Sequence, residues 1–233
     1  MKWNFRRSHS ALLVIDMQND FVQPGAIMEV PQAKEQVPNI ARLIAACRRL
    51  GVPVIYTVHE TDPARCPLEI AAFPHLKEAG MRRGTPGVEV VDELAPAPGE
   101  TVIRKHRFSG FYQTELELVL RSMPVDTLII CGTVTNICCE ATARDAFYRD
   151  YKVVFGSDIC SALNPQAHNA TLTNMEIFGR VMNCEEILAA LERKYRPEVY
   201  ELIDRIESGE EKLIGYPSME AFWADMHAED DDE

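Results

Sequence analysis

The fold follows from one segment of the chain, Leu128-Ile-Ile-Cys-Gly-Thr-Val-Thr-Asn-Ile-Cys-Cys-Glu-Ala-Thr-Ala-Arg-Asp145. Its first part, together with Thr127, is short, apolar and rich in β-branched residues, which is typical of a central parallel strand. Gly132 then lets the backbone turn, and Thr135 or Asn136 can cap a following helix. The segment therefore predicts a strand, a tight loop and a helix in succession.

Cys138 falls in the first turn of this predicted helix. Free N–H groups and the positive end of the helix dipole stabilise a thiolate there, so the thiol is a candidate nucleophile. The alternative is that Cys138 and Cys139 are two small buried residues, which is the commonest fate of a free cysteine. Local sequence leaves both interpretations open.

Other short apolar runs alternate with segments of helical periodicity along the chain. Six strands alternating with helices predict an α/β fold with a three-layer αβα, doubly wound, mainly parallel sheet. The expected strands are Ala11–Ile15, Val52–Val58, Thr101–Arg104, Thr127–Cys131, Lys152–Phe155 and Val181–Met182, with a loop expected at 158–162. The long segment 61–98 contains six prolines and is expected to be irregular, as a lid or a binding wall.

Length limits the number of domains. At 233 residues the chain is long enough for one well-buried α/β domain with an appendage. We expect a domain over residues 1–195 and a C-terminal extension over 196–233, which ends in the acidic tail Glu229–Glu233. The extension is expected to be an arm that packs either on a partner subunit or on its own domain.

Charge, apolar runs and cysteines bear on partners and location. A formal net charge of −12 disfavours nucleic acid, because phosphate contacts need a basic surface. No apolar run approaches the roughly 18 residues that a membrane span needs, so no membrane partner is expected. The run Ala11–Ile15 is too short for a secretory signal, and the seven cysteines lack the paired spacing of a disulfide framework. These features together predict a cytoplasmic protein.

Three ionisable side chains stand at the carboxyl ends of separate predicted strands: Asp16, Lys105 and Cys138. Ligands of open α/β sheets bind at this edge. A carboxylate can take the proton of a thiol, while an ammonium offsets both negative charges and lowers the pKa of the thiol toward working pH. The backbone of the loop that starts at Gly132 can supply N–H groups to an oxyanion. The set predicts an acyl-transfer site without histidine.

Three motifs carry these residues in a characteristic order: Leu13-Val-Ile-Asp-Met-Gln-Asn-Asp-Phe21, Lys105-His-Arg-Phe-Ser-Gly-Phe-Tyr-Gln-Thr114, and Gly132-Thr-Val-Thr-Asn-Ile-Cys138 with Glu140-Ala-Thr-Ala-Arg-Asp-Ala146. With them the sequence resembles the isochorismatase-like cysteine hydrolases, over roughly residues 8–192. That family includes nicotinamidases, N-carbamoylsarcosine amidases, and biuret and ureidoacrylate amidohydrolases.

The resemblance implies a role for each residue of the set. Cys138 would attack a carbonyl carbon, Asp16 would act as general base and then protonate the leaving amine, and Lys105 would orient and charge the pair. It also implies a cis peptide bond between Thr133 and Val134, with the backbone N–H groups of Val134 and Cys138 as the oxyanion hole.

The metal requirement separates branches of this family. The nicotinamidases hold a divalent ion through an Asp-x-His pair after the second strand, and the matching residues here are Thr57-Val-His59. Because the carboxylate is missing, we expect no metal ion and no cofactor, and we expect His59 to be a loop or pocket residue. Nicotinamidase activity is not expected.

The substrate is expected to be a small amide, ureide or N-carbamoyl compound, cleaved through a thioester. Residues expected to bind it are Gln18, Asn19, Phe21, Phe108, Tyr112 and Asn136, each of which has an ordinary loop role as its alternative. Two other functions stay open: an isochorismatase that cleaves a vinyl ether, and a non-catalytic interaction module of the same fold. Family members commonly form homo-oligomers, so a dimer or tetramer is expected.

Overall fold

A computed structural model of the chain describes residues 6–193 without a gap and, beyond them, residues 202, 205, 206, 212, 214–218 and 220–222. The chain divides into two compact units, Met1–Glu192 and Arg193–Glu233. Within the second unit the rings of Tyr216 and Phe222 meet edge to face, with 5.3 Å between their centroids. The predicted acidic tail lies outside the described residues.

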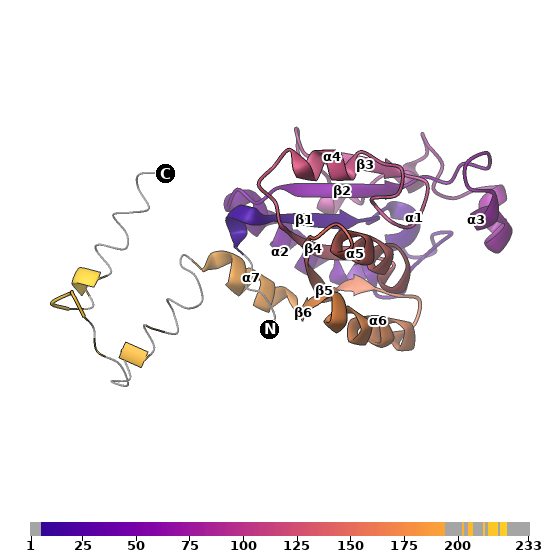
Figure 1. Ribbon diagram of the computed structural model, residues 1–233. Helices are drawn as coiled ribbons and strands as arrows, with labels where there is room; N and C mark the ends of the chain where they lie inside the picture. Colours follow the sequence, from indigo (N-terminus) through magenta and orange to yellow (C-terminus); the bar gives the residue numbers. More distant parts are fainter. Residues whose placement is uncertain are drawn as a thin grey trace. The chain divides into compact units, whose positions relative to one another are not determined.

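The first unit is built on a six-stranded sheet in which all strands are parallel, in the order β3-β2-β1-β4-β5-β6 (Figure 1). The strands are β1 (Ser10–Ile15), β2 (Val54–His59), β3 (Thr101–Lys105), β4 (Thr127–Thr133), β5 (Lys152–Ser161) and β6 (Gly179–Met182). The order reverses between β1 and β4, which creates a switch point at their carboxyl ends. This arrangement confirms the predicted α/β fold.

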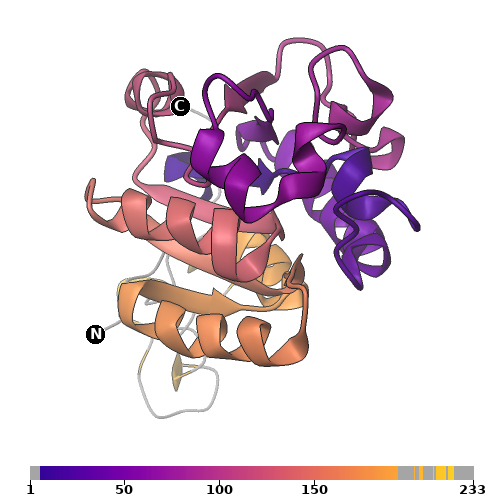
Figure 2. The ribbon, with the colours of Figure 1, turned by 90° about the vertical axis from the view of Figure 1, so that its right-hand side faces the viewer.

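Helices cover both faces of the sheet and complete three layers. One face is covered by α1 (Asn19–Val22), α2 (Ala33–Arg49) and α7 (Cys184–Glu192). The other is covered by α4 (Leu116–Arg121), α5 (Glu140–Phe147) and α6 (Pro165–Phe178), of which α5 and α6 lie side by side in Figure 2. Across the described residues, no helix combines the length and apolarity that crossing a membrane requires.

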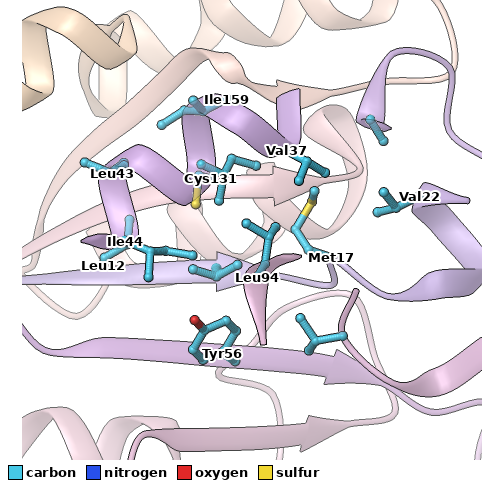
Figure 3. Packing of buried hydrophobic residues seen from close by; sticks show 14 of the residues in the cluster. Leu12, Met17, Val22, Val37, Leu43, Ile44, Tyr56, Leu94, Cys131 and Ile159 are labelled. Carbon is cyan, nitrogen blue, oxygen red and sulfur yellow. The ribbon is translucent and has the colours of Figure 1, made fainter. Parts of the chain in front are cut away.

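The alternation of side chains along each strand fills two separate cores. In β1, Leu12 and Val14 point to the side of α2, whereas Leu13 and Ile15 point to the side of α5. Figure 3 shows the first core, where Leu12 packs with Leu43 and Ile44 of α2. Because every residue of β1 is buried, the strand holds the residue that follows it at a fixed place.

Three segments differ from the prediction. β5 continues to Ser161, so the loop expected at 158–162 is wrong: after an irregularity in the pairing with β4, Cys160 lies opposite Gly132 and Ser161 opposite Thr133. The helix after Gly132 begins with a π-helical turn, Thr135–Cys139. The segment 61–98 contains a short helix, α3 (Pro67–Ala72), and 3-10 turns at Pro74–Lys77, Pro86–Val88 and Asp92–Leu94.

Candidate active site

Asp16 directly follows β1 and is completely buried. Its backbone is in the left-handed region, with φ of 49°. Thr57 Oγ1 donates a hydrogen bond of 2.6 Å to Asp16 Oδ1, and the Asp16 N–H donates to the Thr57 carbonyl at 3.1 Å. Thr57 thus fixes the carboxylate from β2 and leaves Oδ2 turned toward other groups.

Lys105 is the last residue of β3 and is also completely buried. Its Nζ lies 2.6 Å from Asp16 Oδ2 and 3.4 Å from Cys138 Sγ. Two further groups complete its surroundings, His59 Nδ1 at 3.3 Å and the Arg107 carbonyl at 3.2 Å. The ammonium is therefore placed between the carboxylate and the thiol.

Cys138 is brought to this point by the close approach of β4 to β1. Gly132 has φ of +121°, and a Cβ at this position would lie 2.0 Å from the Ile15 carbonyl oxygen. Only glycine fits there. The chain then passes into the π-helical turn that carries Cys138, whose side chain is 3% exposed. The three predicted catalytic side chains thus come together at the carboxyl edge of the sheet.

The pKa of the Cys138 thiol shifts in the direction opposite to the prediction. Burial raises the pKa of Cys138 above its ordinary value, and the Asp16 carboxylate adds to this effect, although the Lys105 ammonium opposes it. The expected lowering of the thiol pKa is wrong because removal from water outweighs the ammonium and the helix end. The same burial would lower the pKa of Lys105, but Asp16 and Cys138 outweigh it and raise the pKa, so the ammonium stays charged.

His59 ends β2 and lies against the site with only 1% of its surface exposed. Its Nδ1 contacts Lys105 Nζ, and its Nε2 lies 2.8 Å from Glu69 Oε1 on α3. Its ring stacks on Phe108 with 6.2 Å between centroids. His59 is thus the last residue of a strand rather than a loop residue, and it packs against Lys105.

One group of possible metal ligands comes together in the part of the chain that the structure describes. The ligand atoms of Asp16, His59 and Cys138 lie within 4.8 Å of one another. The Lys105 ammonium contacts all three side chains, so a cation of the chain itself takes the position that a metal ion would need. These residues do not fit a metal centre while Lys105 stays in place.

The loop before Cys138 carries the Val134 N–H, one of the two groups expected to form an oxyanion hole. The peptide bond between Thr133 and Val134 is cis. The Val134 carbonyl accepts hydrogen bonds from the N–H groups of Ile137 and Cys139, at 3.0 and 3.2 Å. The Val134 N–H has no acceptor among the described residues, which leaves it available to a ligand.

A cavity of about 740 Å³ is lined by residues of α3, of α5 and of the turn that precedes Cys138 in the sequence. Its walls are mostly apolar. They are formed by Cys66, Pro67, Leu68, Glu69, Ala72, Phe73, Arg107, Phe108, Asn136, Ile137, Glu140, Ala141 and Arg144. Of the six residues expected to bind substrate, Phe108 and Asn136 are in this wall.

The other four expected substrate residues have different places. The Gln18 amide is used by the backbone, with hydrogen bonds of 2.8 to 2.9 Å to the His59 N–H and to the carbonyls of His59 and Val88. Asn19 donates to the Pro86 carbonyl at 2.9 Å. Phe21 is buried in the core on the side of α2, and Tyr112 is half exposed outside the cavity wall. None of these four side chains lines the cavity, so their part in substrate binding stays a prediction.

Sequence reasoning missed the helix α3. Glu69, Leu68 and Phe73 belong to the segment expected to be irregular and to form a lid or a binding wall, and they line one side of the cavity. Pro67 at the start and Glu69 in the first turn are typical helix-start residues, and this signal could have located the helix.

Comparison with known proteins places this geometry in context. Residues 10–186 match the family described as the isochorismatase domain. Ureidoacrylate amidohydrolase RutB of Methylobacterium radiotolerans is 34% identical over 188 residues, which cover 72% of this chain and 73% of the relative.

Two solved structures share the fold. A cysteine hydrolase from Pseudomonas syringae pv. phaseolicola 1448A superposes with a TM-score of 0.78 and 34% identity, covering 83% of this chain and 97% of the other. N-carbamoylsarcosine amidase from Thermoplasma acidophilum superposes with a TM-score of 0.65 and 32% identity, covering 75% and 96%. Both similarities extend over most of the first compact unit.

Proposed function

The chain belongs to the isochorismatase family of hydrolases, and we propose that it is a cysteine amidohydrolase that cleaves a C–N bond of a small amide, ureide or N-carbamoyl compound. One observation carries the proposal: a buried ammonium, Lys105, lies 2.6 Å from a carboxylate and 3.4 Å from a thiol. A carboxylate that accepts a proton, a thiol that gives one and a fixed cation are the parts that acyl transfer to sulfur requires.

The first half of the reaction forms a thioester. Asp16 takes the Cys138 proton while Sγ attacks the carbonyl carbon, so negative charge moves to the carbonyl oxygen. The N–H groups of Val134 and Cys138 stabilise that oxyanion. Asp16 then returns the proton to the nitrogen of the leaving group, the C–N bond breaks, and ammonia or an amine departs.

The second half regenerates the thiol. Asp16, again a carboxylate, takes a proton from water while the water oxygen attacks the thioester carbon. The C–S bond breaks, and Asp16 gives its proton to the Cys138 sulfur. The products are an acid, or a carbamic acid when the substrate is a ureide, and the free enzyme.

The raised pKa of the Cys138 thiol fits this sequence of steps. In the resting site the Cys138 thiol is neutral. The one negative charge is that of the Asp16 carboxylate, and the Lys105 ammonium balances it. Moving the proton from Cys138 to Asp16 changes neither the number of charges nor their sum. Lys105 therefore stabilises the site before and after proton transfer without moving, which is the advantage of a preorganised charge.

The cavity and the relatives support the substrate class. RutB is named for ureidoacrylate and the Thermoplasma enzyme for N-carbamoylsarcosine, both of which are compounds with a carbamoyl nitrogen. In this chain Asn136, which is exposed in the cavity wall, offers an amide that matches a carbamoyl group in hydrogen bonding. Phe108 and Ile137 offer apolar contact to the rest of the substrate.

The test is ammonia release from a panel of small amides, N-carbamoyl compounds, ureides and nicotinamide, each assayed with and without a metal chelator. The parent is compared with Cys138→Ala and with Cys139→Ala as a matched control, because Cys139 is an adjacent buried thiol. We expect turnover of a carbamoyl or amide compound that survives the chelator and Cys139→Ala and is abolished by Cys138→Ala. Turnover that survives Cys138→Ala would overturn the proposal, as would a wholly silent panel.

A further inference from the structure

We propose that His59, held by Glu69, is a positioning residue that fixes the Lys105 ammonium between Asp16 and Cys138. The inference rests on the proposed function for its effect on turnover. Its geometry does not: Lys105 Nζ lies 3.3 Å from His59 Nδ1, and His59 Nε2 lies 2.8 Å from Glu69 Oε1. The chain of contacts runs from the cavity wall to the catalytic ammonium.

The partners of His59 determine which of its nitrogens carries the proton. An ammonium has three N–H donors and no acceptor, so in its hydrogen bond with Lys105 the Nδ1 atom is the acceptor and carries no proton. The proton therefore resides on Nε2, which donates to the Glu69 carboxylate. Glu69 selects this tautomer, as a carboxylate commonly does for a histidine whose other nitrogen has a task.

The position of the His59 ring is fixed from several directions. Its N–H donates to Gln18 Oε1 at 2.8 Å and its carbonyl accepts from Gln18 Nε2 at 2.9 Å. Phe108 stacks on the ring. Through these hydrogen bonds the Gln18 amide fixes the backbone of His59 at the end of β2.

This acceptor matters because it is one of the groups that set the position of Lys105 Nζ. Four acceptors surround its three N–H groups: Asp16 Oδ2, Cys138 Sγ, the Arg107 carbonyl and His59 Nδ1. Two of the four, His59 Nδ1 and the Arg107 carbonyl, take no part in the proposed proton transfer. Without His59 Nδ1 the ammonium would keep its charge but lose a fixed direction, so the thiolate formed during attack would be less stabilised.

The substitutions follow from this geometry. His59→Leu removes the acceptor, whereas His59→Asn retains one, because an asparagine Oδ1 can take the place of Nδ1. Glu69→Ala leaves the ring and removes the group that selects its tautomer. His75→Leu is the control, because His75 is an exposed histidine that is absent from the cavity wall.

Two readouts separate positioning from general stability. The first is the rate at which iodoacetamide alkylates Cys138, followed by mass spectrometry of the peptide that carries it, and it needs no substrate. The second is kcat and KM on the compound that the parent turns over. Losing a neighbour that orients a metal ligand typically costs about 10- to 100-fold, and we take the same range for the neighbour that orients Lys105. We expect His59→Leu to lower both the alkylation rate and kcat by that factor with KM little changed.

The rescue variant makes the inference specific. We expect His59→Asn to recover most of the rate lost in His59→Leu, Glu69→Ala to fall between them, and His75→Leu to match the parent. Equal alkylation rates in the parent and a folded His59→Leu would overturn the inference, and so would His59→Asn variants as slow as His59→Leu. If His59→Leu does not fold, the alkylation rate of Glu69→Ala is the test. A rate equal to that of the parent would then overturn the proposal.

The two readouts also keep this inference apart from the proposed function. A silent substrate panel with the expected alkylation pattern would contradict the amidohydrolase assignment and leave the positioning role supported. Turnover of a compound in the panel, with an alkylation rate and a kcat that none of the three variants changes, would support the amidohydrolase assignment and contradict the positioning role.

Discussion

Lys105 Nζ lies 2.6 Å from Asp16 Oδ2, and neither side chain has any exposed surface. Two opposite charges buried together are costly to separate, because each would face a low-dielectric interior alone. They come from strands that are not adjacent in the sheet, since β2 lies between β1 and β3. The pair therefore joins the ends of β1 and β3 across β2 and holds both charges next to the thiol.

Removing one member of this pair is expected to cost stability as well as activity. Lys105→Met leaves the Asp16 carboxylate buried without a counter-ion, and breaking such a pair costs about 3–5 kcal/mol. The double variant Asp16→Asn, Lys105→Met has no buried charge to leave unpaired and should recover most of that loss while staying inactive. Urea unfolding of the two single variants and the double variant measures this coupling. Losses that simply add in the double variant would show that the two charges do not stabilise each other.

The pH dependence of Cys138 alkylation follows from the raised pKa of its thiol. Burial favours the neutral form, so the thiolate fraction should keep rising as the pH increases through the ordinary pKa of a thiol. We expect the alkylation rate of Cys138 to show no plateau between about pH 6 and about pH 10, whereas the same peptide in denaturant levels off near the usual thiol pKa of about 8.5. A plateau below pH 8 in the folded protein would mean that Lys105 outweighs burial.

Gly132 is expected to tolerate no side chain. Its backbone is in a region that L-residues rarely adopt, and the added Cβ of Gly132→Ala would collide with the Ile15 carbonyl. We expect a loss of about 3 kcal/mol or more in the free energy of unfolding. Gly51→Ala is the matched control, because Gly51 also has a positive φ but has open space around it. Similar losses in the free energy of unfolding for the two variants would show that the close approach of β4 to β1 is not the cause.

The cavity between α3 and α5 is expected to control which substrates fit. Ala141 lies in its wall, so Ala141→Phe fills part of the space without touching Asp16, Lys105 or Cys138. We expect KM to rise about tenfold for the largest accepted substrate and to stay nearly unchanged for the smallest, because a filled apolar pocket discriminates by size. Steady-state kinetics on both compounds tests this. An equal change in KM for the two would place the substrate elsewhere.

Much of the fold could be predicted because buried parallel strands are short, continuous apolar runs. Ala11–Ile15 and Thr127–Cys131 have that form, and they became the central strands β1 and β4. The end of β5 could not be predicted, since Asp158 and Ser161 interrupt its apolar character. Its pairing with Gly132 and Thr133 depends on an irregularity opposite β4, which only the folded sheet reveals.

Part of the candidate site could likewise be predicted from the sequence, and part could not. The positions of Asp16, Lys105 and Cys138 at strand ends could be predicted, because parallel strands bring their carboxyl ends to one edge. The contact of His59 with Glu69 joins a strand end to a helix in a segment without strong periodicity, so no sequence pattern indicates it. The direction of the thiol pKa shift depends on total burial, which local sequence does not reveal.

The central claim is that Cys138 forms a thioester, and partitioning with hydroxylamine tests it most directly. Two substrates that share an acyl group but differ in their leaving amine are turned over in the presence of hydroxylamine, and the ratio of hydroxamate to acid is measured. A common acyl-Cys138 intermediate predicts the same ratio for both substrates and no product of either kind from Cys138→Ala. A ratio that changes with the leaving amine, or hydroxamate formed by Cys138→Ala, would contradict the account.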